Sequence, residues 1–140
     1  MLDRMSILFP VVALATLTFA VLLLIPVRRF RAGAAGLVVF DDFRYGESAR
    51  VPPDVALPNR NMMNLLELPV LFYVACLTYY VADCVNGTAL VLAWAYVGLR
   101  LAHSAIHLTY NRVRHRLIAF AASNLALIML WTNLLRAFSA

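Results

Sequence analysis

A group of polar side chains in the first half of the sequence has the residue types and the spacing of a binding site. Arg60, Asn64 and Glu67 occupy positions i, i+4 and i+7. This spacing places three side chains on one face of a helix. A guanidinium, an amide and a carboxylate on one face can bind a ligand that carries both acidic and basic groups.

A second and longer series follows at the same kind of spacing. Its members, with Ser104 beside them, are Arg100, His103, His107, Tyr110 and Arg114. Both series lie in apolar segments, where an ionisable group costs at least a few kcal/mol and is by default a functional hypothesis. At a rise of about 1.5 Å per residue the two series reach similar depths, so we expect Glu67 to contact Arg100 or His103.

Two other interpretations of these residues have to be weighed. Glu67, Arg100 and Asn64 could form a clasp that fixes helix register without any ligand. Against this, the second series continues into the arginine-rich turn 111–116, which favours a polar path open to one side of a membrane. His103 and His107 have the i, i+4 spacing that lets two imidazoles share a metal. Glu67 would have to leave its basic partner to complete such a site, so we expect no metal.

The elements that position these residues are apolar segments long enough to cross a bilayer. The chain is 64% hydrophobic and 14% charged, against roughly 45–50% and about 25% in soluble domains. The predicted spans are residues 7–27, 61–81, 88–110 and 117–135, with a long loop over 28–60. We expect the first span to end at Pro26, and Pro69 to kink the second. The predicted fold is one all-α membrane domain, a four-helix up-down bundle.

All twelve basic residues are arginines, and their distribution predicts an orientation. Six lie between residues 28 and 60 and three between 112 and 116, whereas the turn after residue 81 has none. The positive-inside rule places the first and third loops in the cytoplasm. No basic stripe with interleaved aromatic residues lies outside the spans, so we expect no nucleic-acid partner.

Two segments carry a resemblance to a known family. Residues 59–69 contain an arginine, the pattern Asn-x-x-Glu and a nearby proline, and residues 100–107 lead from Arg100 and two histidines towards Arg116. Together with four spans, a long first loop and short later ones, they resemble the MAPEG family, the membrane-associated proteins of eicosanoid and glutathione metabolism, in its bacterial-type members. The resemblance covers essentially the whole chain and implies a multi-pass protein of the bacterial inner membrane.

The resemblance also implies a function and a set of site residues. It implies a homotrimer in which glutathione, as co-substrate, binds between subunits and is transferred to lipophilic electrophiles or used in a peroxidase reaction. Arg116 matches the arginine that stabilises the glutathione thiolate. The implied binding residues are Arg28, Arg60, Asn64, Glu67, Arg100, His103, Ser104 and His107. The alternative is a non-catalytic protein of the same fold that binds membrane lipid or serves as a subunit of a larger complex. A small transporter is disfavoured because the sequence shows no inverted repeat.

Overall fold

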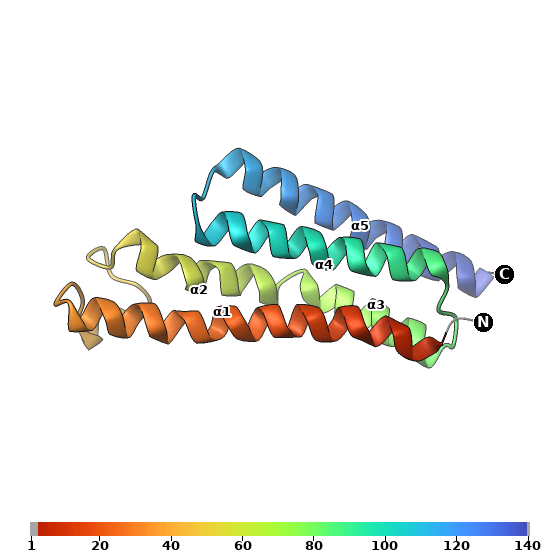
Figure 1. Cartoon of the computed structure of the whole chain (residues 1–140), viewed down its shortest axis with the longest axis horizontal. Coiled ribbons are helices and arrows are strands. Elements are labelled where there is room, and N and C mark those ends of the chain that lie inside the picture. Colours follow the sequence, from red (N-terminus) through yellow and green to blue (C-terminus); the bar gives the residue numbers. More distant parts are fainter. Residues whose placement is uncertain (1–2, 140) are drawn as a thin grey trace.

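The computed structural model describes residues 3–139, which form an antiparallel helical bundle with no β-strand in that range (Figure 1). Its elements are η1 (Arg4–Ile7), α1 (Leu8–Ala34), η2 (Phe40–Phe43), α2 (Pro53–Leu66), α3 (Pro69–Val81), α4 (Gly87–Leu108) and α5 (Val113–Ser139). Four segments are long and apolar enough to cross a membrane, namely η1 with α1, α2 with α3, α4, and α5. The predicted all-α bundle with four membrane spans is confirmed.

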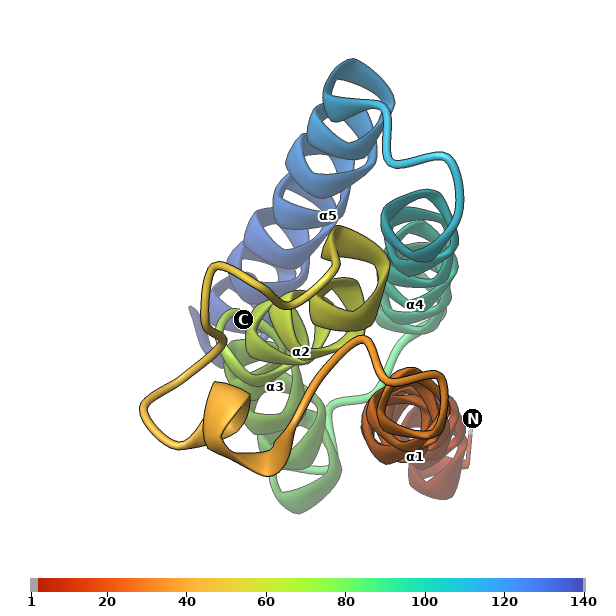
Figure 2. The same cartoon turned by 90° about the vertical axis from the view of Figure 1, so that its left-hand side faces the viewer.

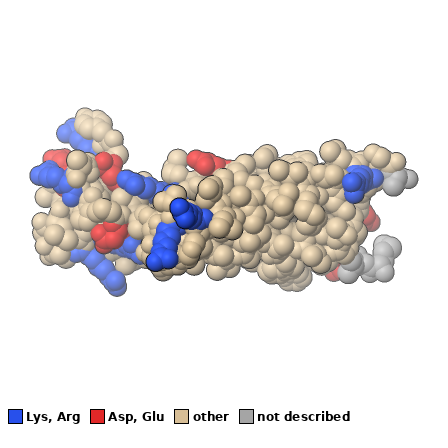
Figure 3. Space-filling view, turned by 90° about the horizontal axis from the view of Figure 1, so that it is seen from above, with Lys and Arg blue, Asp and Glu red and all other residues tan. Residues whose placement is uncertain are grey.

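The bundle has two ends that differ in charge. At one end, at the left of Figure 1, α1 and α4 finish and α2 and α5 begin. We call this end the arginine-rich end. Figure 2 views the bundle from this end and shows α2 lying between α1, α4 and α5. Figure 3 shows most charged side chains gathered towards this end, with a broad uncharged surface between them and the opposite tip.

Helix α1 is longer than the sequence analysis expected. The prediction that it ends at Pro26 is wrong, because Pro26 lies inside the helix and α1 continues to Ala34. The residues that follow Pro26 include arginines, which are good helix formers. The helix ends where Gly36 adopts a φ of +72°, and Leu37 N–H donates to the carbonyl of Ala32. This is the Schellman arrangement that terminates many helices.

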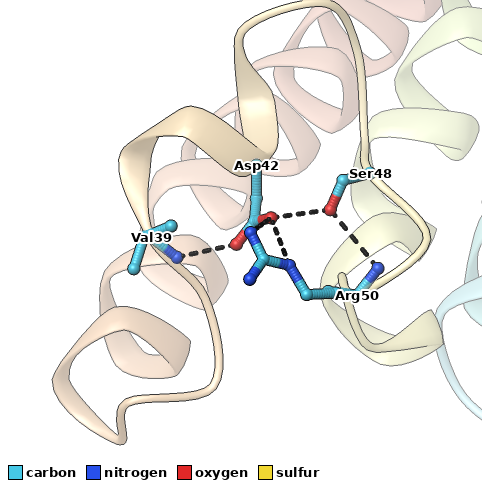
Figure 4. Close-up of polar contacts among 4 residues, drawn as sticks. All are labelled: Val39, Asp42, Ser48 and Arg50. Atoms are coloured by element: carbon cyan, nitrogen blue, oxygen red, sulfur yellow. Dashed lines mark hydrogen bonds and ion pairs between the residues drawn. The ribbon is translucent and has the colours of Figure 1, made fainter.

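The loop after α1 covers residues 35–52 rather than 28–60 and is ordered around one carboxylate. Asp42, only 4% exposed, accepts hydrogen bonds from the Val39 N–H at 2.9 Å and the Ser48 hydroxyl at 2.7 Å (Figure 4). Arg50 completes the group with an ion pair of 2.9 Å. The Val39 N–H, then Ser48 and Arg50, lower the pKa of Asp42. The loop is therefore a folded unit tied together by a buried charge.

The second span is divided into two helices. α2 ends at Leu66 and α3 begins at Pro69, with Glu67 as the residue that caps α2. Pro69 has no N–H to donate to the carbonyl of Leu65, and its ring clashes with a straight continuation of the helix. The predicted kink at Pro69 is thus a complete break between two helices.

The opposite end is closed by hydrogen bonds between helices. The Tyr79 hydroxyl lies 2.7 Å from Asn133 Oδ1 and 3.1 Å from the carbonyl of Leu130. The Asn86 amide donates to the same Asn133 oxygen at 3.1 Å, while its own oxygen caps α4 by accepting from Ala89 N–H. These contacts join α3, the start of α4 and α5 into a closed packing arrangement.

Candidate functional site

A cavity of about 420 Å³ opens at the arginine-rich end between α2, α4 and α5. In Figure 1, α5 diverges from α2 towards this end. The cavity is lined by Leu57, Arg60, Asn64, His103, His107, Asn111, Val113, Arg116, Leu117 and Phe120. The lining thus has two arginines, two histidines and two asparagines but no acidic side chain. Such a lining can donate many hydrogen bonds and suits an anionic ligand.

Helix α2 contributes Arg60 and Asn64 from one face, as their spacing predicts. The Arg60 side chain is exposed at the cavity mouth, and Asn64 lies deeper and is half-buried. Asn64 Nδ2 donates to the carbonyl of Arg60 at 2.9 Å. This bond holds the Asn64 amide against its own helix and leaves its side-chain oxygen available as an acceptor.

Helix α4 contributes two buried histidines to the cavity wall. His103 and His107 are each 3% exposed, and their ring centroids are 5.8 Å apart. His103 Nδ1 lies 3.1 Å from the carbonyl of Arg116, which ties α4 to the first turns of α5. His103 Nε2 and His107 Nδ1 have no hydrogen-bond partner within residues 3–139. Each histidine therefore lines the cavity and has a buried ring nitrogen without a partner in the described chain.

Arg100 lies one turn deeper than His103 and is fully buried. One of its terminal nitrogens donates to the carbonyl of Asn64, close to the break between α2 and α3. Its guanidinium lies 5.7 Å from the centre of the Phe120 ring, and Phe120 lines the cavity. Nε and the other terminal nitrogen lack partners within the described chain. Arg100 forms no ion pair with a carboxylate within residues 3–139, which makes this region favourable for negative charge.

Arg116 lies in the first turns of α5 and lines the cavity opposite α2. Its Nη1 donates to Asn111 Oδ1 at 2.9 Å, and this bond fixes the direction of the guanidinium. Asn111 can accept this bond because it sits in the turn before α5 with a φ of +47°, a conformation that asparagine tolerates. The remaining guanidinium nitrogens can donate to a ligand in the cavity.

Five of the nine residues implied by the resemblance line this cavity: Arg60, Asn64, His103, His107 and Arg116. Arg100 lies directly behind it. Ser104 is buried on the α2 side of α4, where its hydroxyl donates to Asn61 Oδ1 at 3.3 Å. Arg28 binds the carbonyls of Asp54 at 2.6 Å and Leu108 at 3.3 Å, so it joins α1 to the start of α2 and the end of α4.

Glu67 is exposed and does not line the cavity. The expected contact of Glu67 with Arg100 or His103 is wrong within this single chain. In the described residues the ion pairs are Arg29 with Glu47 and Arg50 with Asp42. Glu67 is the C-cap residue at which α2 ends before the break at Pro69, and its side chain is exposed there.

Part of the cavity wall was not predicted from the sequence, most notably Phe120. A signal was present, because Phe120 follows Arg116 by four residues and so lies on the same face of α5. Asn111 could have been found only from the turn geometry that directs it towards Arg116. Within residues 3–139 no group of three or more histidine, cysteine, aspartate or glutamate side chains is placed to hold a metal.

The sequence model of the MAPEG family matches residues 7–136 of this chain. The match covers nearly the whole chain, and the protein therefore belongs to the MAPEG family, an integral membrane family of glutathione and eicosanoid metabolism. Comparison with curated proteins and with solved structures finds no match.

Proposed function

We propose that this protein binds glutathione in the cavity at the arginine-rich end and that the glutathione thiolate attacks lipophilic electrophiles, in a transferase or a peroxidase reaction. The observation that carries the proposal is the charge of the lining, which combines Arg60 and Arg116 with two histidines and lacks a carboxylate. Glutathione has two carboxylates, and arginine binds carboxylates in a bidentate manner. A volume of about 420 Å³ falls in the range of small-molecule sites.

The position of Arg116 supports a role in activating the thiol. A thiolate is the reactive nucleophile, and a neighbouring guanidinium lowers the pKa of a thiol. Arg116 is held by Asn111 at the cavity wall, and Leu117 and Phe120 add apolar surface beside it. A cationic group next to an apolar wall suits the meeting of a thiolate with a lipophilic electrophile.

The exposure of Glu67 supports an assembly in which a second copy covers it, and the family resemblance implies that this assembly is a homotrimer. A carboxylate on the outer face of a membrane span costs at least a few kcal/mol if lipid surrounds it. A neighbouring copy could cover Glu67 and place it against the cavity of the next subunit, where it would accept the amino group of glutathione. Gly98 and Ala102 lie exposed on α4 and allow a helix to approach closely. Native mass spectrometry should detect a trimer, and a stable monomer would contradict this arrangement.

A calorimetric titration of the detergent-solubilised protein with glutathione tests the proposal. Hydrogen bonds to charged groups contribute about 1.5–3 kcal/mol, so Arg116→Ala should weaken binding by about tenfold or more. Arg114→Ala is the matched control, because Arg114 is exposed and does not line the cavity. On the change Arg116→Ala, an analogue of glutathione with methyl in place of the thiol should lose less affinity than glutathione itself loses. Absence of binding to the unmodified protein would refute the proposal.

A further inference from the structure

A second hollow lies on the other side of the arginine-rich end, between the last turns of α1 and the loop that follows. It is a groove of about 710 Å³ lined by Ile25, Pro26, Arg29, Phe30, Gly33, Ala34, Val38, Val39, Phe40 and Phe43. The lining is apolar except for Arg29. We call it the loop groove. It shares no lining residue with the cavity of the proposed glutathione site.

The loop groove continues the lipid-facing surface of α1. Phe19 and Leu22 are 65% and 44% exposed. Together with Pro26 and Phe30 they form a series in which successive residues are three or four positions apart. This spacing puts all four on one face of the helix. A hydrocarbon chain lying against α1 in the bilayer can therefore extend along the same face into the groove.

The groove also lies at the level expected for lipid headgroups. The candidate span that includes α1 has 31 residues, which at 1.5 Å per residue extends about 46 Å. The hydrocarbon core is about 30 Å thick, so the final turns of α1 reach into the headgroup region. Phe40 and Tyr45 in the following loop are 90% and 93% exposed. Exposed aromatic side chains are typical of membrane interfaces.

Arg29 is the charged side chain in the lining of this apolar groove, and Glu47 partly balances its charge from outside the lining. Its guanidinium lies 4.4 Å from the centre of the Phe43 ring, and one terminal nitrogen is 3.3 Å from Glu47 Oε1. Its Nε is buried and has no hydrogen-bond partner within residues 3–139. No acidic residue lines the groove. A phosphodiester, which is anionic and accepts hydrogen bonds, is complementary to this guanidinium.

We propose that the loop groove binds a glycerophospholipid of the surrounding leaflet. One acyl chain lies along the apolar wall formed by Ile25, Phe30 and Val38, and the phosphodiester contacts Arg29. A second copy of the chain is a less suitable occupant, because an apolar segment of protein would offer no acceptor to the guanidinium of Arg29, the charged residue of the lining. The groove is thus a lipid site separate from the site proposed for glutathione, and neither proposal depends on the other.

Native mass spectrometry of the full-length protein in detergent tests this lipid site. The protein is titrated with phosphatidylglycerol and, in parallel, with diacylglycerol that has the same acyl chains but no phosphate. Phosphatidylglycerol should be retained and diacylglycerol much less. Ala34→Trp should reduce phospholipid retention by about tenfold, because Ala34 lines the groove and the indole would fill it. Ala35→Trp is the matched control, since Ala35 is exposed one position beyond the lining.

A second pair of variants keeps the test valid if the tryptophan disturbs folding. Arg29→Gln should lower phosphatidylglycerol retention about tenfold and leave the weak diacylglycerol signal unchanged. Arg31→Gln should retain phospholipid like the unmodified protein, because Arg31 is exposed and does not line the groove. Equal retention of both lipids would overturn the proposal. A change of oligomeric state in Ala34→Trp without loss of lipid would assign the groove to a second copy and also overturn it.

Discussion

The two ends of the bundle differ in whether their buried polar groups without partners lie beside a cavity. At the opposite end Tyr79, Asn86 and Asn133 bond to one another and to the backbone. At the arginine-rich end, His103 and Arg100 each bond one backbone carbonyl and keep other nitrogens without partners in the described chain. Trp131 Nε1, near the opposite end, also lacks a partner in the described chain, but Trp131 lines neither hollow. Buried polar groups in native proteins are nearly always paired. Groups left unpaired beside a cavity are therefore candidates for ligand binding, whereas the paired groups stabilise the fold.

The packing of α5 explains this difference. At the opposite end α5 packs against α3, where Tyr79 reaches Asn133. At the arginine-rich end a cavity separates α5 from α2, and its polar lining replaces interhelical contacts. One bundle thus has a closed end that holds the helices together and an open end that can admit a small molecule.

The largest expected difference between the two ends is their side of the membrane. Cysteine is placed at Ala49 or at Ala82, exposed positions at the arginine-rich and opposite ends, in a Cys84→Ser background. The remaining Cys76 is buried. Because arginine-rich loops remain in the cytoplasm, an impermeant thiol reagent should label Cys at position 82 in intact cells and leave position 49 unlabelled. The reverse pattern would contradict the predicted orientation.

A smaller effect is expected from removing the hydrogen bonds that join the helices at the opposite end. Asn133→Ala removes the acceptor that Tyr79 and Asn86 share and should lower stability by about 1 kcal/mol. Glutathione affinity should not change. Thermal unfolding in detergent and the calorimetric titration measure the two quantities. Thr132→Ala is the control, because the Thr132 hydroxyl bonds only within its own helix, to the carbonyl of Ile128. Loss of glutathione affinity in Asn133→Ala would show that the two ends are not independent.

The smallest and most local effect is expected in the loop tied by Asp42. Its folded pKa is lowered, mainly by the Val39 N–H, so the loop's stabilisation is present above the usual aspartate pKa of about 3.9. It is lost as the pH falls through the lowered folded value. Asp42→Asn removes the charge and should speed tryptic cleavage after Arg44 at neutral pH. Asp41→Asn, a change at an exposed neighbour, should leave cleavage unchanged.

The sequence predicted the parts of this structure that depend on local pattern. The length of the apolar segments predicted the four membrane spans. The helical spacing predicted that Arg60 shares a helix face with Asn64, and that His103 shares one with His107. The family resemblance, confirmed by the match over residues 7–136, implied a role for Arg116.

The features that could not be predicted depend on tertiary geometry and on where helices end. The end of α1 depends on the turn at Gly36 rather than on Pro26, since proline in a helix removes one bond but does not always end the helix. The exposure of Glu67 was not predicted, because the second span was expected to continue through Pro69 and instead α2 ends at this residue. The loop groove requires the loop to fold back along α1, which no periodic pattern encodes.

The central claim is that the arginine-rich end stabilises a glutathione thiolate. The direct measurement is the ultraviolet absorbance of thiolate during a pH titration of the protein with saturating glutathione. A free thiol has a pKa of about 8.5, and the bound thiol should ionise near neutral pH in the unmodified protein. Arg116→Ala should move ionisation to higher pH without changing the oligomeric state. The account would be contradicted if thiolate appeared only at the pH at which free glutathione ionises.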